Sequence, residues 1–292
     1  MDRLEMKIKR KNAANAQGMK RNVSGEMEYL TFPALEETGM VRHLFTTRLG
    51  GVSGGMFASM NLSYNRGDDK DAVDENFRRV AQALGCGVGD FVCSDQTHTT
   101  NVRKVTKADR GKGVVTAKDY TDVDGLITNE PGIVLATFYA DCVPLYLVDT
   151  KNRAIGLSHS GWRGTVGHMG ACTLEAMKEA YGTQAGDVVA AIGPSICGDC
   201  YEVSSDVAQQ FAGAFPNGLA EQVLTPKGGD KYLLDLWKAN YFVFLQAGVP
   251  KEHIYVMDLC TCCNPDYLFS HRASKGKRGN LGAFFGLEKE QN

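Results

Sequence analysis

The sequence predicts an α+β fold in which mixed sheets are flanked by helices. Strand-like apolar runs and amphipathic helical patterns alternate irregularly along the chain, as in mixed α/β sandwiches. The chain has no internal repeat, no heptad pattern and no low-complexity linker. We therefore expect a single domain over residues 28–287, with a basic disordered tail before it (residues 1–27) and a short C-terminal tail after it (residues 288–292).

The elements follow from composition and spacing. Short runs of β-branched, aromatic and other apolar residues predict strands, the last of them at 254–258: residues 29–32, 41–47, 91–94, 124–129, 133–148, 154–157, 188–192 and 254–258. Apolar residues spaced three and four apart predict four helices: residues 71–84, 165–181, 205–215 and 235–247. Residues 111–122 have the composition of an exposed connection, and residues 260–286 are rich in glycine and basic side chains.

Charge and composition exclude several classes of protein. The 32 basic and 34 acidic residues give no electrostatic reason to expect binding to nucleic acid or to a membrane surface. No run approaches the roughly 18 apolar residues of a spanning helix, and no apolar segment follows the basic start as in a signal peptide. Nine cysteines in a chain of this length indicate metal binding or catalysis rather than a disulfide framework. We predict a cytoplasmic protein.

His98, Cys142 and His159 are the strongest candidates for a metal site. Each stands at or near the end of a predicted strand, where side chains from distant segments meet in one cleft. Two histidines and one cysteine are typical of catalytic zinc sites with a fourth position left open. Taken singly, a lone histidine is more often structural and a cysteine among apolar residues is more often a small core residue. A Cys142 nucleophile with His98 or His159 as its base is a second interpretation, because an imidazolium lowers a thiol's pKa.

Polar residues near this triplet suggest substrate contacts. Arg163 lies in the turn 161–164, whose two glycines precede a predicted helix, a geometry in which backbone amides bind anions. Arg48 stands at the entrance of a loop with four glycines (residues 48–55) and suits an anion or a sugar hydroxyl. In an extended chain Asp141 and Cys142 point to opposite faces, so Asp141 either orients a ligand or is buried and hydrogen-bonded on the other side.

Two further cysteine clusters leave alternatives open. The pair Cys197-x-x-Cys200 has the spacing of half a structural zinc site. The second cluster, Cys260-Thr-Cys-Cys263, is compressed and followed by Pro265. A separate all-cysteine zinc site is the less favoured of the interpretations of these clusters, and Cys263 is also a candidate to face the metal cleft.

Eight short motifs together resemble the YfiH/laccase-domain family, from about residue 40 to residue 287. They are Thr46-Thr-Arg-Leu-Gly-Gly-Val-Ser, Asn61-Leu-Ser, Gln96-Thr-His, Asp124-Gly-Leu-Ile-Thr, Ala140-Asp-Cys-Val-Pro, His159-Ser-Gly-Trp-Arg-Gly, Gly193-Pro-Ser-Ile and Ser270-His-Arg. One departure is Ala273, where many relatives have a second arginine after Arg272. The resemblance covers nearly the whole chain outside the basic tail.

This resemblance implies a fold, an activity and a site. The family fold is a mixed α/β sandwich related to deamidating toxins, here a single YfiH-like catalytic domain. Its members are described as purine nucleoside phosphorylases, converting inosine, adenosine, guanosine or methylthioadenosine and phosphate to a free base and a ribose 1-phosphate. They also deaminate adenosine. The family's histidine–cysteine–histidine metal site maps onto His98, Cys142 and His159, which we expect to bind Zn²⁺, with copper as an adventitious occupant.

The expected partners are purine nucleosides and phosphate, without nucleic acid or membrane, and a homodimer is compatible with the sequence. We expect one set of residues to contact substrate or phosphate: Arg48, Asn61, Gln96, Asp141 and Arg163. Three rival functions remain: a Cys–His hydrolase, a non-catalytic zinc-holding binding protein, and the copper-dependent polyphenol oxidase of the family's older label. The oxidase needs a trinuclear copper cluster, for which six histidines in the whole chain are too few.

Overall fold

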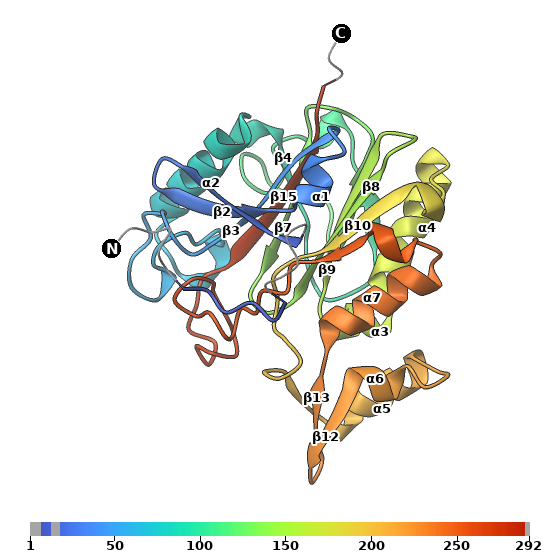
Figure 1. The fold of residues 1–292 in the computed structure, drawn as a ribbon. Coiled ribbons are helices and arrows are strands. Elements are labelled where there is room, and N and C mark those ends of the chain that lie inside the picture. The colour runs from blue at the N-terminus through green and yellow to red at the C-terminus, as the bar shows by residue number, and fades with distance from the viewer. Residues whose placement is uncertain (1–6, 13–17, 290–292) are drawn as a thin grey trace.

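Two sheets packed face to face form the centre of the molecule (Figure 1). The computed structural model describes residues 7–12 and 18–289, and within them the main sheets have six strands each. An apolar cluster fills the space between the sheets, with Phe45 and Leu135 from one and Tyr146 and Leu157 from the other. The predicted mixed α/β fold with sheets flanked by helices is confirmed.

The first sheet carries α2 on its outer face. Its strand order is β1-β2-β3-β15-β7-β4. The bounds are β1 Lys20–Ser24, β2 Met27–Thr31, β3 Val41–Thr46, β4 Phe91–Cys93, β7 Val134–Tyr139, β15 Leu281–Leu287, α1 Pro33–Glu36 and α2 Lys70–Leu84. Side chains of a strand alternate between faces, so Val134 and Ala136 pack in the cluster that includes α2, while Leu135 and Tyr139 pack between the sheets. The Asp69 carboxylate accepts from Ala72 N and caps the start of α2.

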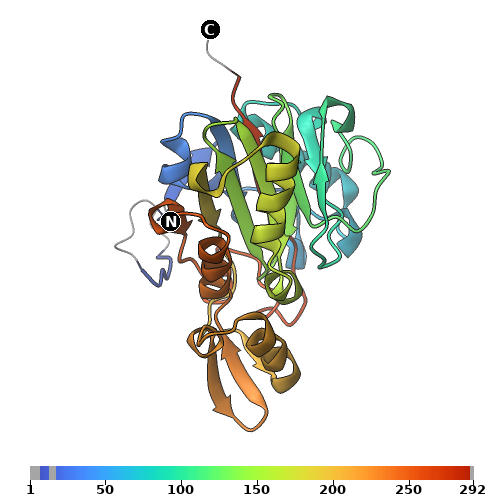
Figure 2. The same cartoon turned by 90° about the vertical axis from the view of Figure 1, so that its right-hand side faces the viewer.

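The second sheet is covered by α4 and α7 (Figure 2). Its strand order is β14-β10-β8-β9-β6-β5. The bounds are β5 Val102–Lys104, β6 Gly125–Thr128, β8 Val143–Asp149, β9 Ala154–Ser160, β10 Val188–Ile192, β14 Ile254–Val256, α3 Trp162–Val166, α4 Met169–Tyr181 and α7 Leu236–Gln246. None of the helices in the described part of the chain is long and apolar enough to cross a membrane.

A small three-stranded sheet with two helices projects from the second sheet (Figure 1). Its bounds are β11 Glu202–Ser204, β12 Leu224–Gly228, β13 Lys231–Leu234, α5 Ser205–Ala214 and α6 Ala220–Val223. Val207, Phe211 and Leu234 of this projection join the apolar cluster that also contains Trp237 and Phe244 of α7. Short 3₁₀ turns connect the elements at η3 Gly55–Phe57, η4 Tyr64–Arg66, η5 Val88–Asp90, η6 Lys107–Asp109, η7 Ala185–Asp187 and η8 Lys251–His253.

Three sequence predictions are wrong in the interior of the chain. The predicted helix 165–181 is two helices, α3 and α4, because His168 between them adopts φ 56 and interrupts the helix. The predicted strand 133–148 is β7 of the first sheet followed by β8 of the second. The strand predicted to be the last is followed by a further strand, β15. Its Gly282 makes the segment look unlike a strand in the sequence, but the glycine is needed for packing, because a Cβ there would come within 2.5 Å of the Phe284 ring.

The predicted basic disordered tail, residues 1–27, is corrected for its described parts. Lys20–Ser24 forms β1, which pairs antiparallel with β2. Lys9 N donates to Asn264 Oδ1 at 2.7 Å, and Arg10 pairs with Leu259 in an isolated bridge. The remaining part of the predicted tail lies outside the described residues. Because these contacts are with segments far along the chain, sequence proximity gives no sign of them.

The burial of His43 in β3 is expected to make the protein less stable at acidic pH. Burial lowers its pKa to about 4, and its Nε2 accepts from Phe32 N at 2.8 Å. In the unfolded chain the His43 side chain binds a proton below about pH 6.5, whereas in the folded chain it does so only near pH 4. Lowering the pH between these values therefore stabilises the unfolded state relative to the folded state. We expect His43 to cost about 2 kcal/mol of stability between about pH 7 and about pH 4.5. Urea unfolding at both pH values measures this, and an equal pH dependence in H43Q would contradict it.

A histidine–cysteine–histidine group beside a pocket

Three segments from the two sheets bring His98, Cys142 and His159 together. His98 lies in the loop after β4, Cys142 in the turn from β7 to β8, and His159 near the end of β9. Their ligand atoms all lie within 4.8 Å of one another. Cys142 Sγ is 3.9 Å from His98 Nε2, and the two imidazole rings meet edge to face at 4.9 Å between centroids. The predicted triplet therefore converges.

The turn at Asp141 explains how Cys142 reaches this group. Asp141 adopts φ 87, a left-handed conformation that is costly for a residue with a Cβ. Its carboxylate accepts from the Thr261 hydroxyl at 2.6 Å and from Arg272 N at 2.7 Å, and its carbonyl accepts from Ile196 N at 3.0 Å. These bonds hold the chain where it crosses from one sheet to the other. Asp141 is thus buried and hydrogen-bonded, which was one of its two predicted roles.

Asp124 organises the two histidines. It is fully buried at the start of β6, and its Oδ1 lies 2.7 Å from His159 Nδ1. The same carboxylate accepts from the backbone amides of Thr97, His98 and Thr99. With Nδ1 bound to Asp124, His159 presents Nε2 to the group, as histidine ligands of metals do. Asp124 is not among the site residues predicted from the sequence, although it begins one of the eight motifs.

The protonation of the group follows from its charges. Burial raises the pKa of the Cys142 thiol, but His159 and His98 outweigh burial, and the pKa falls to about 6. Burial lowers the pKa of His159, but Cys142 and Asp124 outweigh it and raise the pKa to about 9. Cys142 is therefore a thiolate and His159 an imidazolium near neutral pH. A metal ion that binds the thiolate and Nε2 replaces the imidazolium proton.

The residues present fit a metal ion. Two imidazoles and a thiolate are the ligands that zinc and copper prefer, and three protein ligands leave a position for another molecule. The backbone also leaves space for close approach, because a Cβ on Gly161 would lie 2.9 Å from His98 Cδ2 and 3.2 Å from Cys142 Sγ. The structure thus supports a metal site at the predicted residues, and the kind of metal is a separate question.

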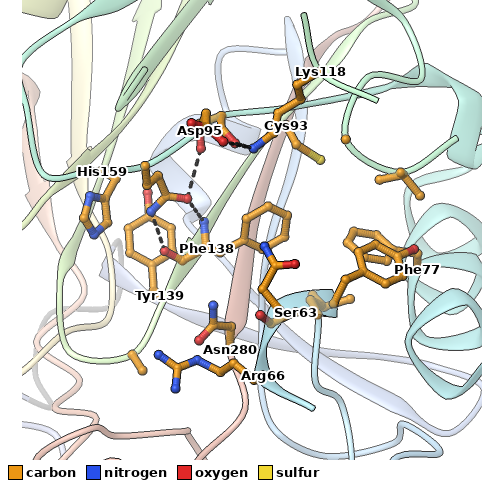
Figure 3. A pocket seen from close by; sticks show the side chains of 18 of the residues that line it. Ser63, Arg66, Phe77, Cys93, Asp95, Lys118, Phe138, Tyr139, His159 and Asn280 are labelled. Atoms are coloured by element: carbon orange, nitrogen blue, oxygen red, sulfur yellow. Dashed lines mark hydrogen bonds and ion pairs between the residues drawn. The ribbon is translucent and has the colours of Figure 1, made fainter. Parts of the chain in front are cut away.

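A cavity of about 650 Å³ opens onto this group. Cys142, His98 and His159 form one end of it. Figure 3 shows Asp95 and Lys118 on the opposite side of the cavity from Arg66 and Asn280. Aromatic side chains contribute to the wall: Tyr64, Phe77, Phe138 and Tyr139. The cavity has the size of sites that enclose a small molecule.

Two of the predicted substrate residues lie at this cavity. Gln96 lines it, but both ends of its amide are bound to the backbone of Phe138, with Nε2 donating to the carbonyl at 2.7 Å and Oε1 accepting from the amide at 2.7 Å. Asn61 is buried beneath the wall, and its Oδ1 accepts from Ser63 N and Asn280 N. Asn61 positions two segments of the wall.

The other predicted contacts lie elsewhere. The Arg48 guanidinium donates to Ala58 O at 2.8 Å and to Pro265 O at 2.7 Å, and stacks on Phe269. Arg163 is exposed on α3 and stacks on Trp162. Neither arginine lines the cavity, and Asp141 lies behind Cys142 rather than in the wall. Cys263 does not face the cavity either.

Sequence reasoning missed two arginines in the wall. Arg66 is exposed in η4, and its guanidinium has no ion-pair or hydrogen-bond partner among residues 7–12 and 18–289. Burial and then the positive charge of Arg66 lower the pKa of Arg278 to about 10. Arg278 Nε is buried without a partner in the described chain. The only signal in the sequence was that both arginines lie close to a motif of the family, Arg66 five positions after Asn61 and Arg278 eight positions after Ser270.

Residues 113–118, which the sequence predicted to be part of an exposed connection, also form part of the cavity wall.

The two-sheet α/β fold thus places a cavity beside a histidine–cysteine–histidine group that could bind a metal ion. Residues 42–288 match the family described as "Multi-copper polyphenol oxidoreductase laccase", and the chain belongs to that family. The family resemblance inferred from the motifs is confirmed.

Named relatives give this family a second description. The chain is 39% identical over 251 residues to "Purine nucleoside phosphorylase YlmD" of Geobacillus stearothermophilus, covering 84% of this chain and 89% of that protein. It is 35% identical over 230 residues to "Adenosine deaminase RL5" of an unknown prokaryotic organism, covering 78% and 87%. The crystal structure of Bacillus licheniformis YfiH superposes with a TM-score of 0.85 at 32% identity, covering 92% of this chain and 99% of that one.

Proposed function

We propose that this protein is a zinc-dependent purine nucleoside phosphorylase that also deaminates adenosine. The observation that carries the proposal is a single cavity with the metal-binding group at one end and two neighbouring arginines in its wall. The names of the relatives support the same two reactions. Phosphorolysis needs an anion site, a sugar site and a base site within one bound complex, and the cavity offers residues for each.

Arg66 and Arg278 are the proposed phosphate site. Two guanidinium groups close enough for the charge of one to lower the pKa of the other are unfavourable neighbours unless an anion lies between them. The unpartnered Arg278 Nε is a further donor for a phosphate oxygen. Arg278 Nη1 also donates to the Asn280 side chain, which fixes part of the guanidinium plane. We thus assign to Arg66 and Arg278 the phosphate contacts that the sequence had led us to expect from Arg48 and Arg163.

Aromatic and amide side chains are suited to the nucleoside. Tyr64 stacks on Phe77 at 5.6 Å between centroids, and its hydroxyl donates to Asp74 at 2.6 Å, which holds the ring in the wall. We propose that the purine packs against Tyr64 and Phe138, which are half-buried and line the cavity. Ser63 and Asn280 lie beside the arginines and are placed to bind ribose hydroxyls.

The reaction follows from this arrangement. A phosphate oxygen held by the two arginines attacks C1′ of the ribose, and the bond from C1′ to the purine nitrogen breaks. The electron pair of that bond goes to the purine, which takes up the proton that the attacking hydrogen phosphate gives up and leaves as the free base, while the new C–O bond gives ribose 1-phosphate. A zinc ion bound to His98, Cys142 and His159 would supply a Lewis acid for both phosphorolysis and deamination. Asp124 and the turn at Asp141 hold these ligands in place.

The older oxidase description does not fit the histidines. His43 accepts from Phe32 N, and His168 Nε2, between α3 and α4, lies 3.1 Å from Ala214 O at the end of α5. Among the described residues, the only groups of three or more side chains that could share an ion are the triplet and a set of four cysteines. A trinuclear copper cluster needs many more histidines than one site supplies.

A Cys–His hydrolase is the alternative function for which the structure offers a specific observation. Cys142, His159 and Asp124 form a thiolate–imidazolium–carboxylate series, the arrangement that activates a cysteine nucleophile. His98 supports the metal enzyme over the hydrolase, because a hydrolase has no need of a second imidazole within 4.8 Å of the thiolate. The purine nucleosides, moreover, have no acyl group for a thiolate to attack.

The test is base release from inosine and from adenosine with and without phosphate, before and after metal removal by a chelator. We expect hypoxanthine release only with phosphate, its loss after chelation, and its return with zinc. Turnover that survives chelation and is abolished by alkylation of Cys142 would instead support the hydrolase. Bound zinc with no turnover of any purine nucleoside would support a binding protein.

A further inference from the structure

Two cysteine pairs from distant parts of the chain meet at one edge of the second sheet. The strands β10 and β14 are parallel neighbours, so the segments that follow them leave the sheet at the same edge. Pairing continues past both strands through an isolated parallel bridge between Ser195 and Cys260. The turns Cys197-x-x-Cys200 and Cys260-x-x-Cys263 therefore face each other.

The four sulfur atoms converge on one point. The Sγ atoms of Cys197, Cys200, Cys260 and Cys263 all lie within 4.8 Å of one another. Cys263 Sγ is 3.4 Å from Cys200 Sγ and 3.9 Å from Cys197 Sγ. In a tetrahedral zinc site with Zn–S bonds of about 2.3 Å, the sulfur atoms are about 3.8 Å apart. The two separations from Cys263 Sγ lie close to that value, and the remaining pairs lie within 4.8 Å.

The surroundings suit thiolates. Cys197 N and Cys263 N donate to Cys260 Sγ at 3.2 Å and 3.3 Å, and amide donors favour the charged form of sulfur. Lys11, which pairs with the Asp199 carboxylate, lies close enough to Cys197 and Cys263 for its charge to interact with theirs. Cys262 stands in the same run of sequence but outside the group.

A role in the core, a disulfide or an iron–sulfur cluster fits this geometry less well. Cysteines that act as small core residues pack against carbon, whereas these four point at one another. A disulfide would use two of the sulfurs, and all nine cysteines, each within the described residues, are unpaired. An iron–sulfur cluster spreads its thiolate ligands over several iron atoms, which needs wider spacing than 4.8 Å. A single four-coordinate ion accounts for all four sulfurs.

We propose that Cys197, Cys200, Cys260 and Cys263 bind one structural zinc ion, separate from the ion at the cavity. The site joins the β10 and β14 segments at the base of the projecting sheet, since β11 begins two residues after Cys200. It also steadies the turn that presents Cys142. Thr261, between two ligands, donates to the Asp141 carboxylate at 2.6 Å, and Ile196 N donates to the Asp141 carbonyl at 3.0 Å. Loss of the ion would loosen both contacts.

The experiment is metal analysis and native mass spectrometry of the full chain, expressed with zinc and purified without chelator. We expect two zinc ions per chain in the wild type, one in C263S and one in C142S. The matched control C262S changes the neighbouring cysteine and keeps two. Zinc K-edge absorption of C142S is expected to show four sulfur ligands at about 2.3 Å.

A C263S protein with the wild-type zinc content would overturn the proposal. So would a wild-type mass lower by the two hydrogens of each disulfide, or iron in place of zinc. If C263S does not fold, zinc release from the C142S protein by an organomercurial thiol reagent decides the matter, with one equivalent per chain supporting the site and none refuting it.

Discussion

Replacement of Cys142 by serine is expected to lower phosphate-dependent base release by at least about 10³-fold, equivalent to about 4 kcal/mol of transition-state stabilisation. The reason is that Cys142 supplies the one anionic ligand of the triplet, and a neutral hydroxyl is a poor substitute for a thiolate. Cys142 is half-buried at a turn whose hydrogen bonds come from Asp141, so the fold does not depend on its sulfur. Turnover, zinc content and melting temperature measured on one preparation test this.

The control is C172S, which changes a half-buried cysteine on α4 away from the cavity. It is expected to keep both turnover and zinc. A C142S protein that unfolds, while C172S does not, would favour the non-catalytic zinc-holding protein, in which the metal serves the fold. A folded C142S protein with normal turnover would show that the triplet takes no part in the reaction.

Replacement of Arg278 by methionine is expected to raise the KM for phosphate and lower kcat/KM about 10- to 100-fold, with little change in the response to inosine. A hydrogen bond to a charged group is worth about 1.5–3 kcal/mol, and Arg278 is proposed to make such bonds to phosphate. The melting temperature should hold or rise, because the change removes a half-buried guanidinium whose buried Nε has no partner in the described chain and which lies beside a like charge. Initial rates at varied phosphate and a thermal melt measure the two effects.

Two other arginines serve as controls. R163M changes an exposed side chain outside the cavity and is expected to leave the phosphate KM unchanged. R48M removes hydrogen bonds to Ala58 O and Pro265 O and is expected to lower stability rather than phosphate affinity. A phosphate KM that responds to R48M or R163M and not to R278M would return the anion site to the residues chosen from sequence.

Much of the fold was predictable where the pattern is local. The helix α2 follows from the spacing of Val73, Phe77 and Leu84, and β10 from an unbroken apolar run. The proposed metal site was predictable for a different reason, since residue type and strand-end position are visible in sequence. His98, Cys142 and His159 each interrupt an apolar or β-branched stretch with a side chain that has no role in an ordinary strand.

The features that sequence reasoning missed depend on tertiary contacts. Residues 133–148 form one apolar run, and its division between the two sheets depends on a turn at Asp141 that is held by hydrogen bonds from Thr261 and Arg272, far along the chain. Arg278 lies in a glycine- and lysine-rich segment where no local pattern separates it from its solvated neighbours. Cys263 rather than Cys262 joins the four-sulfur group because the pairing of β10 with β14 sets which sulfur faces Cys197.

The most direct measurement of the central claim is the sugar product of inosine turnover in phosphate buffer, followed by ³¹P NMR alongside chromatography of the base. A phosphorylase gives ribose 1-phosphate and hypoxanthine in equal amounts, and the rates of formation of both products should fall together in R278M at low phosphate. Free ribose with hypoxanthine would mean that water, not phosphate, is the nucleophile, and the phosphate site assigned to Arg66 and Arg278 would then be wrong.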